Sequence, residues 1–393
     1  MGIFLLLAAA ECVQRLHGKI GWDTEIYCAA VKAFQDGLDP YLINNLGGME
    51  LSFVYQPVYL YIIAPLCNLS RIVPIPFMFA SSLATVAAVC LWPSVWNRRN
   101  ASVAAALALG GFSGFAWTLQ TGNVSAFELL VLSLAVIAMR ARRWTVAAVV
   151  LGALGSLKLV SLILLAVVLV ADESWSRRVR LLMLGSAAFT AIGLVSAALQ
   201  PDYMLTWLRQ VAGGIEGQHA PITEFGDLSN PSMIFLLGGI IGATGYAPVS
   251  LLLYGLAFLT VSGVTAFIAM WREKGVPDPD LRIGFALLVL ILFMFRLKPY
   301  SLLMTSLPVW MLAMRLQTSG RIAVVFLATA GPMVWEVLSR VIFEKDGFLW
   351  HYQQPLLLSA VLCLLLILYC GPLACSLSSS PPVCDDNTRA SKF

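Results

Sequence analysis

The chain has 393 residues, of which 59% are apolar and 12% charged, and its formal net charge is +4. Soluble globular domains carry about twice this share of charged residues, so the composition excludes an ordinary soluble protein. Apolar segments of about 20 residues, the length that crosses a bilayer, follow one another along almost the whole chain. We therefore predict an all-α, polytopic membrane protein surrounded by membrane lipids. The small net charge gives no reason to expect nucleic-acid binding.

About twelve helical spans are predicted, because a backbone that faces lipid must satisfy its own hydrogen bonds. With the amino terminus inside, almost every short basic cluster lies on the cytoplasmic side, as the positive-inside rule requires. Counting 57–70 as a span would move Arg98 and Arg99 outside, so we expect 55–69 to be a helix that lies in the outer interface or is only partly inserted. The predicted spans are 3–16, 77–96, 101–119, 124–140, 144–157, 159–171, 178–199, 248–271, 281–296, 299–316, 321–338 and 354–374.

The organisation expected from these spans is one membrane domain over 1–375, followed by a disordered cytoplasmic tail over 376–393. The first ten residues lack a basic region, so they are interpreted as part of a retained first span rather than a cleaved signal. The eight Cys show no CxxC spacing, and most lie in or beside apolar runs. Free thiols are therefore favoured over a disulfide framework or a zinc site.

The most informative segment follows the first apolar run, where residues 21–27 read Gly-Trp-Asp-Thr-Glu-Ile-Tyr. A carboxylate at the membrane surface, shielded by aromatic side chains, can have a raised pKa and act as a general base. Asp23 is therefore the first catalytic candidate, and Glu25 completes an Asp-x-Glu pair. The alternatives are that Asp23 only caps a helix over 24–36 and that Glu25 only complements its dipole.

Lys158 lies between two apolar runs, 144–157 and 159–171, each too short for a perpendicular span. The two runs are predicted to form a broken hairpin that carries one cation at its tip. A cation at membrane depth is costly and normally marks a function. Lys158 could bind an anionic phosphate and stabilise it as a leaving group. The alternative is a Lys at a helix end whose ammonium reaches out to water.

Two further turns carry polar candidates at the outer ends of spans. Arg296 and Lys298 form a candidate phosphate clamp, with interfacial anchoring as the competing interpretation. Gln120 and Asn123 flank a Thr-Gly turn. Gly122 allows the chain to reverse there and Asn123 can cap the next helix, and Gln120 and Asn123 could also bind sugar hydroxyls.

A long outer loop over 200–231 is expected to cover a sugar site, and it contains His219. This side chain could assist proton transfer or bind a hydroxyl. A lone loop His is more often exposed and idle. His219 is therefore kept as a binding candidate only.

Several of these motifs together resemble the polyprenyl-phosphate-sugar-dependent glycosyltransferases of the C superfamily. The resemblance is greatest to the polyprenol-phosphate-mannose-dependent mannosyltransferases, glycosyltransferase family 87. The chain departs from the family at Tyr55-Gln56-Pro57, where Tyr-Pro-Pro is usual, and after Lys158, where Pro is usual. Tyr55 is a substrate-binding candidate. The residues that carry the resemblance are Asp23, Gly37, Asp39, Pro40, Tyr41, Pro57, Pro65, Asn123 and Lys158.

The resemblance implies transfer of a hexose, namely mannose, from a polyprenyl phosphate to a lipid- or glycan-linked acceptor. The reaction would occur at the outer or periplasmic face of the plasma (inner) membrane, by one inverting displacement with Asp23 as base. The chain has no Gly-rich nucleotide loop, so a transferase must use a lipid-linked donor, and no metal or cofactor is expected. Two other classes stay open: a transporter or flippase of lipid-linked sugars, and a non-catalytic scaffold for glycan assembly.

Overall fold

The computed structural model describes residues 2–69, 74–212, 214–215, 278–294, 297–330 and 361, and within them every regular element is a helix. The expected all-α class is confirmed over these residues. The α-helices are α1 Gly2–Leu16, α2 Trp22–Gln35, α3 Val58–Asn68, α4 Pro74–Cys90, α5 Arg98–Gly110, α6 Gly114–Thr121, α7 Ser125–Arg140, α8 Trp144–Leu157, α9 Trp175–Leu199, α10 Pro201–Val211, α13 Pro279–Leu292, α14 Ser306–Ala313 and α15 Thr318–Thr329. The 3-10 helices are η1 Ile43–Asn45, η2 Gly111–Ser113, η3 Leu159–Val170 and η4 Pro299–Thr305.

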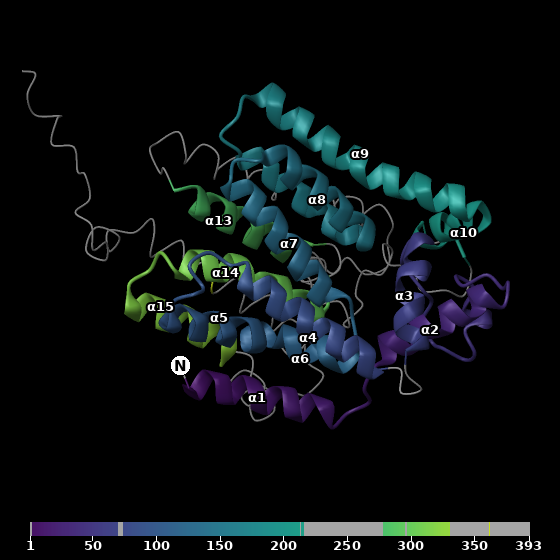
Figure 1. Cartoon of the computed structure of the whole chain (residues 1–393), viewed down its shortest axis with the longest axis horizontal. Helices are drawn as coiled ribbons and strands as arrows, with labels where there is room; N and C mark the ends of the chain where they lie inside the picture. Colours follow the sequence, from purple (N-terminus) through teal and green to yellow (C-terminus); the bar gives the residue numbers. More distant parts are fainter. Residues whose placement is uncertain are drawn as a thin grey trace, which may run out of the picture.

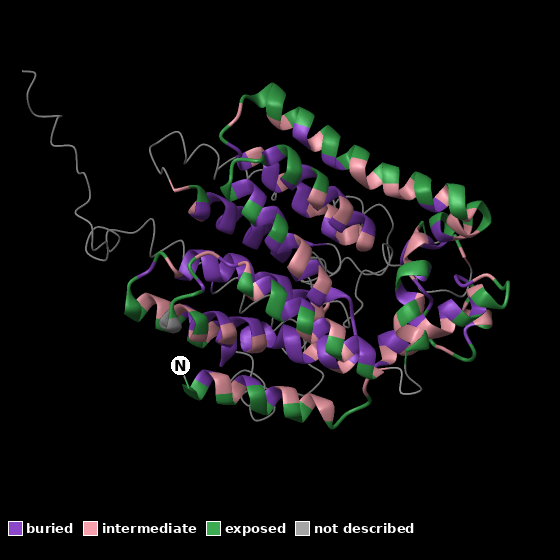
Figure 2. Ribbon diagram, in the orientation of Figure 1, coloured by how far each residue is buried: buried purple, intermediate pink, exposed green. Residues whose placement is uncertain are grey.

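The helices α4 to α8 and α13 to α15 form the central body, with α1 along one edge and α9 along the opposite edge (Figure 1). The helix α9 packs on α8, α8 on α7 and α7 on α4, while α1 packs on α5. Figure 2 shows the buried residues concentrated on the central helices, whereas α9 is largely exposed. Exposed apolar side chains on α9 include Met183 and Leu194, at 67% and 65%.

Two helical stretches in the described part of the chain are long and apolar enough to cross a membrane, Asn100–Thr121 and Trp175–Leu199. The other predicted spans that the structure describes are shorter helices. The predicted span 248–271, the span 354–374 apart from residue 361, and the tail 376–393 lie outside the described residues, and so does the second part of 321–338, from residue 331 on. The number of spans and their orientation therefore stay predictions.

Three predicted spans are not continuous α-helices. The stretch 101–119 is broken by η2, where Phe112 and Ser113 have φ angles of 50° and 60°. These left-handed conformations are uncommon for residues with a side chain, and a pattern of apolar residues does not report them. The stretch 159–171 is the 3-10 helix η3, and 299–316 divides into η4 and α14.

A second apolar cluster lies at one end of the molecule, where α2, α3 and α10 gather (Figure 1). Trp207 of α10 donates a hydrogen bond from Nε1 to the carbonyl of Val54 at 2.9 Å. The loop expected over 200–231 thus begins as a helix that packs on the segment before α3. The expected interfacial helix is present as α3, and its depth in a membrane stays a prediction.

A disulfide joins Cys28 of α2 to Cys67 of α3. The expectation of free thiols was wrong for this pair, because residues 39 apart in sequence are brought together only by the packing of α2 on α3. Cys12 and Cys90 carry free thiols, as expected.

Candidate functional site

The start of α2 is fixed against the turn between α6 and α7. The backbone N–H of Gly21 donates to the carbonyl of Gln120 at 2.6 Å. Gly122, in the left-handed region with a φ of 73°, lies directly against Thr24. A Cβ on Gly122 would stand 2.1 Å from Cγ2 of Thr24, so only glycine allows this approach. These contacts hold together two segments that lie about 100 residues apart in sequence.

This approach brings Asp23 and Asn123 into contact. The side-chain amide of Asn123 donates from Nδ2 to Oδ2 of Asp23 at 2.8 Å, and the same Nδ2 lies 3.3 Å from the hydroxyl of Tyr27. The Tyr27 hydroxyl is 2.9 Å from that of Tyr55. Asp23 is only 9% exposed. It does not cap α2, which begins at Trp22 without a side-chain cap, so the capping alternative fails.

The two phenols beside the carboxylate stay neutral. Burial, then the neighbouring Tyr55 and then the charge of Asp23 raise the pKa of Tyr27 well above its usual range. Burial and the charge of Asp23 also raise the pKa of Tyr55. Both hydroxyls therefore keep their hydrogens at neutral pH, where they can donate to a carboxylate or to a sugar oxygen.

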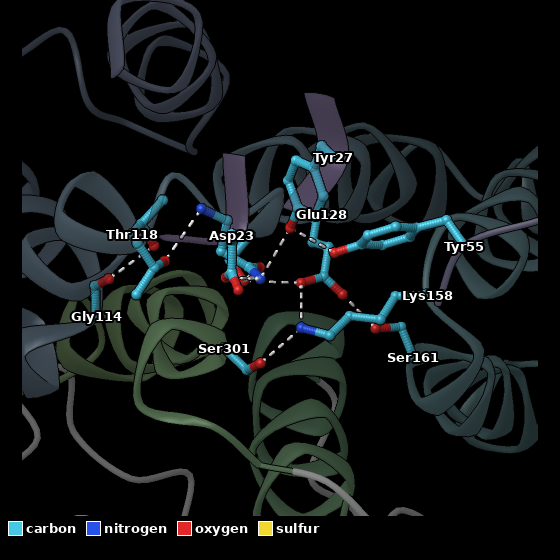
Figure 3. Close-up of polar contacts among 12 residues, drawn as sticks. Asp23, Tyr27, Tyr55, Gly114, Thr118, Glu128, Lys158, Ser161 and Ser301 are labelled. Carbon is cyan, nitrogen blue, oxygen red and sulfur yellow. Dashed lines mark hydrogen bonds and ion pairs between the residues drawn. The ribbon is translucent and has the colours of Figure 1, made fainter. Parts of the chain in front are cut away.

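A second polar cluster surrounds Glu128, which is completely buried on the first turn of α7. Lys158 donates from Nζ to Oε2 of Glu128 at 3.1 Å, and Ser161 donates to Oε1 at 2.5 Å. The backbone N–H of Ser161 donates to the carbonyl of Lys158 at 2.8 Å, so the two residues that bind Glu128 belong to the turn that opens η3. Figure 3 shows Lys158, Ser161 and Glu128 pointing toward one another.

Lys158 is also bound by residues of η4. Its Nζ donates to Oγ of Ser301 at 2.8 Å and lies 4.9 Å from the centre of the Tyr300 ring. Only 13% of its side chain is exposed, so the ammonium does not reach out to water as the alternative required. The expected hairpin is confirmed: α8 and η3 pack on each other, and Lys158 is the single extended residue between them.

The two clusters form one continuous polar network. The hydroxyl of Ser125 lies 2.9 Å from Oδ1 of Asn123 and 3.0 Å from Oε2 of Glu128. The network therefore runs from the Asp23 carboxylate to the Lys158 ammonium through the first turn of α7.

Glu128 was missed by the sequence predictions. The available signal was its position inside the predicted span 124–140, since an ionisable residue in an apolar span marks a functional site by default. Lys158 was selected by the same reasoning. The sequence signal that Glu128 and Lys158 are partners was their opposite charge.

The remaining predicted site residues lie apart from the network or outside the described residues. Glu25 pairs with Lys19 at 3.2 Å and does not join the contacts of Asp23 described above. The side-chain Oε1 of Gln120 is buried without a hydrogen-bond partner in the described part of the chain. Lys298 is half-buried and immediately precedes η4. Arg296 and His219 lie outside the described residues.

No group of three or more His, Cys, Asp or Glu side chains in the described residues is arranged to hold a metal ion. Among curated protein sequences, none matches the chain at a significant level.

The sequence profile of glycosyltransferase family 87 matches residues 53–306, well over half of the chain. The matched region includes Asn123, Glu128 and Lys158, whereas Asp23 precedes it. Members of this family are membrane proteins and transfer sugars. The expected resemblance is confirmed: the chain belongs to glycosyltransferase family 87.

Proposed function

We propose that the chain transfers a hexose, mannose by family resemblance, from a polyprenyl phosphate to a hydroxyl of a lipid- or glycan-linked acceptor. The observation that carries this proposal is the polar network between the buried Asp23 carboxylate and the Lys158 ammonium. Displacement of a phosphate from a sugar needs a base for the incoming hydroxyl and a positive charge for the leaving phosphate. Asp23 and Lys158 supply these two groups.

The proposed reaction is a single displacement. The acceptor oxygen forms a bond to the anomeric carbon while Asp23 takes the hydroxyl proton. The bond between the anomeric carbon and the phosphate oxygen breaks, and the polyprenyl phosphate leaves with the bonding electrons, stabilised by Lys158. The configuration at the anomeric carbon is inverted. Retention would require a second carboxylate as nucleophile at close range; Glu25, the nearest acid in sequence, pairs instead with Lys19.

The other predicted residues have supporting roles in this proposal. Asn123 holds one oxygen of the Asp23 carboxylate, which fixes its orientation toward the acceptor. The Tyr55 hydroxyl, together with Gln120 and His219, binds sugar hydroxyls. The cations of the turn before η4, Arg296 and Lys298, add positive charge for the phosphate.

The disulfide supports an outward-facing site. Disulfides persist in oxidising compartments and are rare in the cytosol. The Cys28–Cys67 bridge lies on α2, the helix that carries Asp23. We therefore propose that the site faces the outer or periplasmic side of the plasma (inner) membrane.

The experiment that tests this function is sugar transfer by the purified protein from radiolabelled polyprenyl-phosphate-mannose, and separately glucose, to host lipid extract. We expect transfer by the wild type and by Asp36→Asn, an exposed carboxylate at the C-cap of the same helix, and none by Asp23→Asn. Glu25→Gln should transfer at close to the wild-type rate. If Asp23→Asn still transfers, Asp23 is not the base.

The result for the wild type also separates the other two classes of function. A folded wild type that moves lipid-linked sugar across vesicles without transferring it would be a flippase. A folded wild type that does neither would be a scaffold. Either result contradicts the transferase proposal.

A further inference from the structure

The ammonium of Lys158 already has partners in the structure without a donor. An ammonium has three N–H donors. One points to Glu128 at 3.1 Å and one to Ser301 at 2.8 Å, and the Tyr300 ring lies over the cation at 4.9 Å. Two of the three N–H groups are therefore engaged, and a phosphate that binds Lys158 either takes the third N–H beside Glu128 or replaces one of these partners.

Glu128 is the partner that a phosphate would replace. Phosphate and carboxylate are both anions, so they compete for the same cation and repel each other at short range. Ser301 and Tyr300 are neutral, and nothing in their charge opposes a phosphate. The competition is strong because the Glu128 side chain is fully buried, and water cannot screen it.

An ionised Glu128 without Lys158 would be a buried charge with only hydroxyl partners, Ser161 and Ser125. Leaving one member of a buried ion pair without its partner is strongly unfavourable. Uptake of a proton removes this charge. The phosphate can then take the cation without leaving two anions side by side.

The hydrogen-bonding pattern around Ser125 is compatible with a proton on the Glu128 carboxylate. The amide of Asn123 presents Nδ2 to the Asp23 carboxylate, so its Oδ1 faces Ser125 as an acceptor. The Ser125 hydroxyl thus lies between two acceptor oxygens, at 2.9 Å and 3.0 Å, with one hydrogen to donate. A protonated Glu128 would supply the missing hydrogen, and every contact from Glu128 to Asp23 would then have a donor.

We propose that Glu128 is a positioning residue that holds Lys158 until the donor arrives, and that it takes up one proton as the donor phosphate replaces it. The inference rests on the proposed function, because it takes a lipid-linked phosphate as the ligand of Lys158. The proton comes from the aqueous phase and returns to it when the polyprenyl phosphate product leaves. Donor binding is therefore coupled to pH at a residue that does not touch the substrate.

The charged and titratable groups around Glu128 allow this assignment to be tested. Lys158 faces it from the junction of α8 and η3, and Tyr55 faces it from the segment before α3. Asp23 lies beyond Asn123, and the Tyr300 ring contacts Lys158. Tyr55 stays neutral across the neutral pH range, because burial raises its pKa well above the usual value.

The test measures binding of polyprenyl-phosphate-mannose to the purified protein by calorimetry, without acceptor, at several pH values between about 6 and 8. The probe is a phosphodiester, so its own charge does not change over this range, unlike that of a phosphomonoester. In the wild type we expect the Kd to rise with pH, by up to about tenfold per pH unit, the limit for uptake of one proton. Two buffers of different ionisation enthalpy should report proton uptake directly.

Glu128→Gln should bind the donor more tightly than the wild type at the upper end of this range, with little dependence on pH. If Glu128 had a merely structural role, Glu128→Gln would instead weaken binding of the donor. The control is Glu50→Gln, an exposed carboxylate that should behave as the wild type. Should Glu128→Gln fail to fold, the absence of proton uptake by the wild type would still overturn the proposal.

The outcomes separate this inference from the proposed function. If the wild type binds polyprenyl-phosphate-mannose no better than polyprenol, the phosphate site itself is wrong. The wild type could instead prefer polyprenyl-phosphate-mannose to polyprenol, take up no proton and bind with the same affinity as Glu128→Gln. That result would overturn the role of Glu128 and leave the phosphate site intact.

Discussion

The contact between Asn123 and Asp23 gives the most direct test of the candidate site. Asn123→Ala removes the amide that donates to the carboxylate at 2.8 Å and changes no charge. A hydrogen bond to a charged group contributes about 1.5–3 kcal/mol. If this energy fixes the carboxylate for its attack on the acceptor proton, kcat/KM should fall by about 10- to 150-fold.

Asn123→Asp should be more harmful than Asn123→Ala, although it preserves the shape of the side chain. Two ionised carboxylates with oxygens 2.8 Å apart would repel each other by about 6 kcal/mol at an effective dielectric constant of 20. The pair would instead share a proton, and the base would be lost. The signature of this contact is the order of kcat/KM: highest in the wild type, lower in Asn123→Ala and lowest in Asn123→Asp.

The assay is transfer of radiolabelled mannose from polyprenyl-phosphate-mannose, with Asn44→Ala, an exposed Asn in η1, as the control. Each variant is first shown to be folded by its thermal unfolding in detergent. A folded Asn123→Ala that retains the wild-type kcat/KM would refute a role for this hydrogen bond in catalysis.

Three further changes test the cation, the phenols and the disulfide. Lys158→Met should abolish transfer and cost about 3–5 kcal/mol of stability, since it leaves the buried Glu128 without its partner; adding Glu128→Gln should restore the thermal midpoint but not transfer. Because the pKa of Tyr27 is raised in the fold, its contribution to stability should be fully present below about pH 10, where unfolded tyrosines remain neutral, and should be lost as pH rises above that value. Tyr27→Phe should reduce this alkaline loss of stability in unfolding measured against pH. Removing the disulfide with Cys28→Ser and Cys67→Ser should lower stability by about 2–5 kcal/mol, while thiol labelling of the unfolded, unreduced wild type should leave this pair unmodified.

The sequence predicted the class of fold and several individual members of the site, for reasons that are local. Apolar runs predicted helices, and a cation or carboxylate beside such a run predicted a function at Asp23 and Lys158. The turn at Gly122 was also recognised from its residues. Each of these signals lies within a few residues of the feature that it predicts.

What the sequence did not predict depends on contacts between distant segments. Asn123 was interpreted as a turn residue or a sugar ligand, and its contact with Asp23 exists only because α2 packs on the α6–α7 turn. The pairing of Cys28 with Cys67 likewise follows from the packing of α2 on α3. Hydropathy does not distinguish an α-helix from the 3-10 helix η3, which opens with the hydrogen bond from the N–H of Ser161 to the carbonyl of Lys158.

The position of Asp23 depends on how closely α2 approaches the turn at Gly122, and this approach can be tested without touching the carboxylate. Successive residues of an α-helix point about 100° apart, so a small shift of α2 would carry Asp23 away from Asn123. Gly122→Ala would place a Cβ 2.1 Å from Cγ2 of Thr24, so α2 or the turn must shift. We expect Gly122→Ala to lose most of its transfer activity.

The strain of a left-handed residue must be separated from this steric effect. Gly37 has a similar φ of 74° at the other end of α2, but a Cβ there meets nothing within 4 Å. Gly37→Ala should therefore cost about 1–2 kcal/mol of stability and keep its transfer activity. Gly122→Ala combined with Thr24→Ser, which removes Cγ2, should regain much of the activity. If the double variant is as inactive as Gly122→Ala while Gly37→Ala is active, the close packing of Thr24 on Gly122 does not position the base.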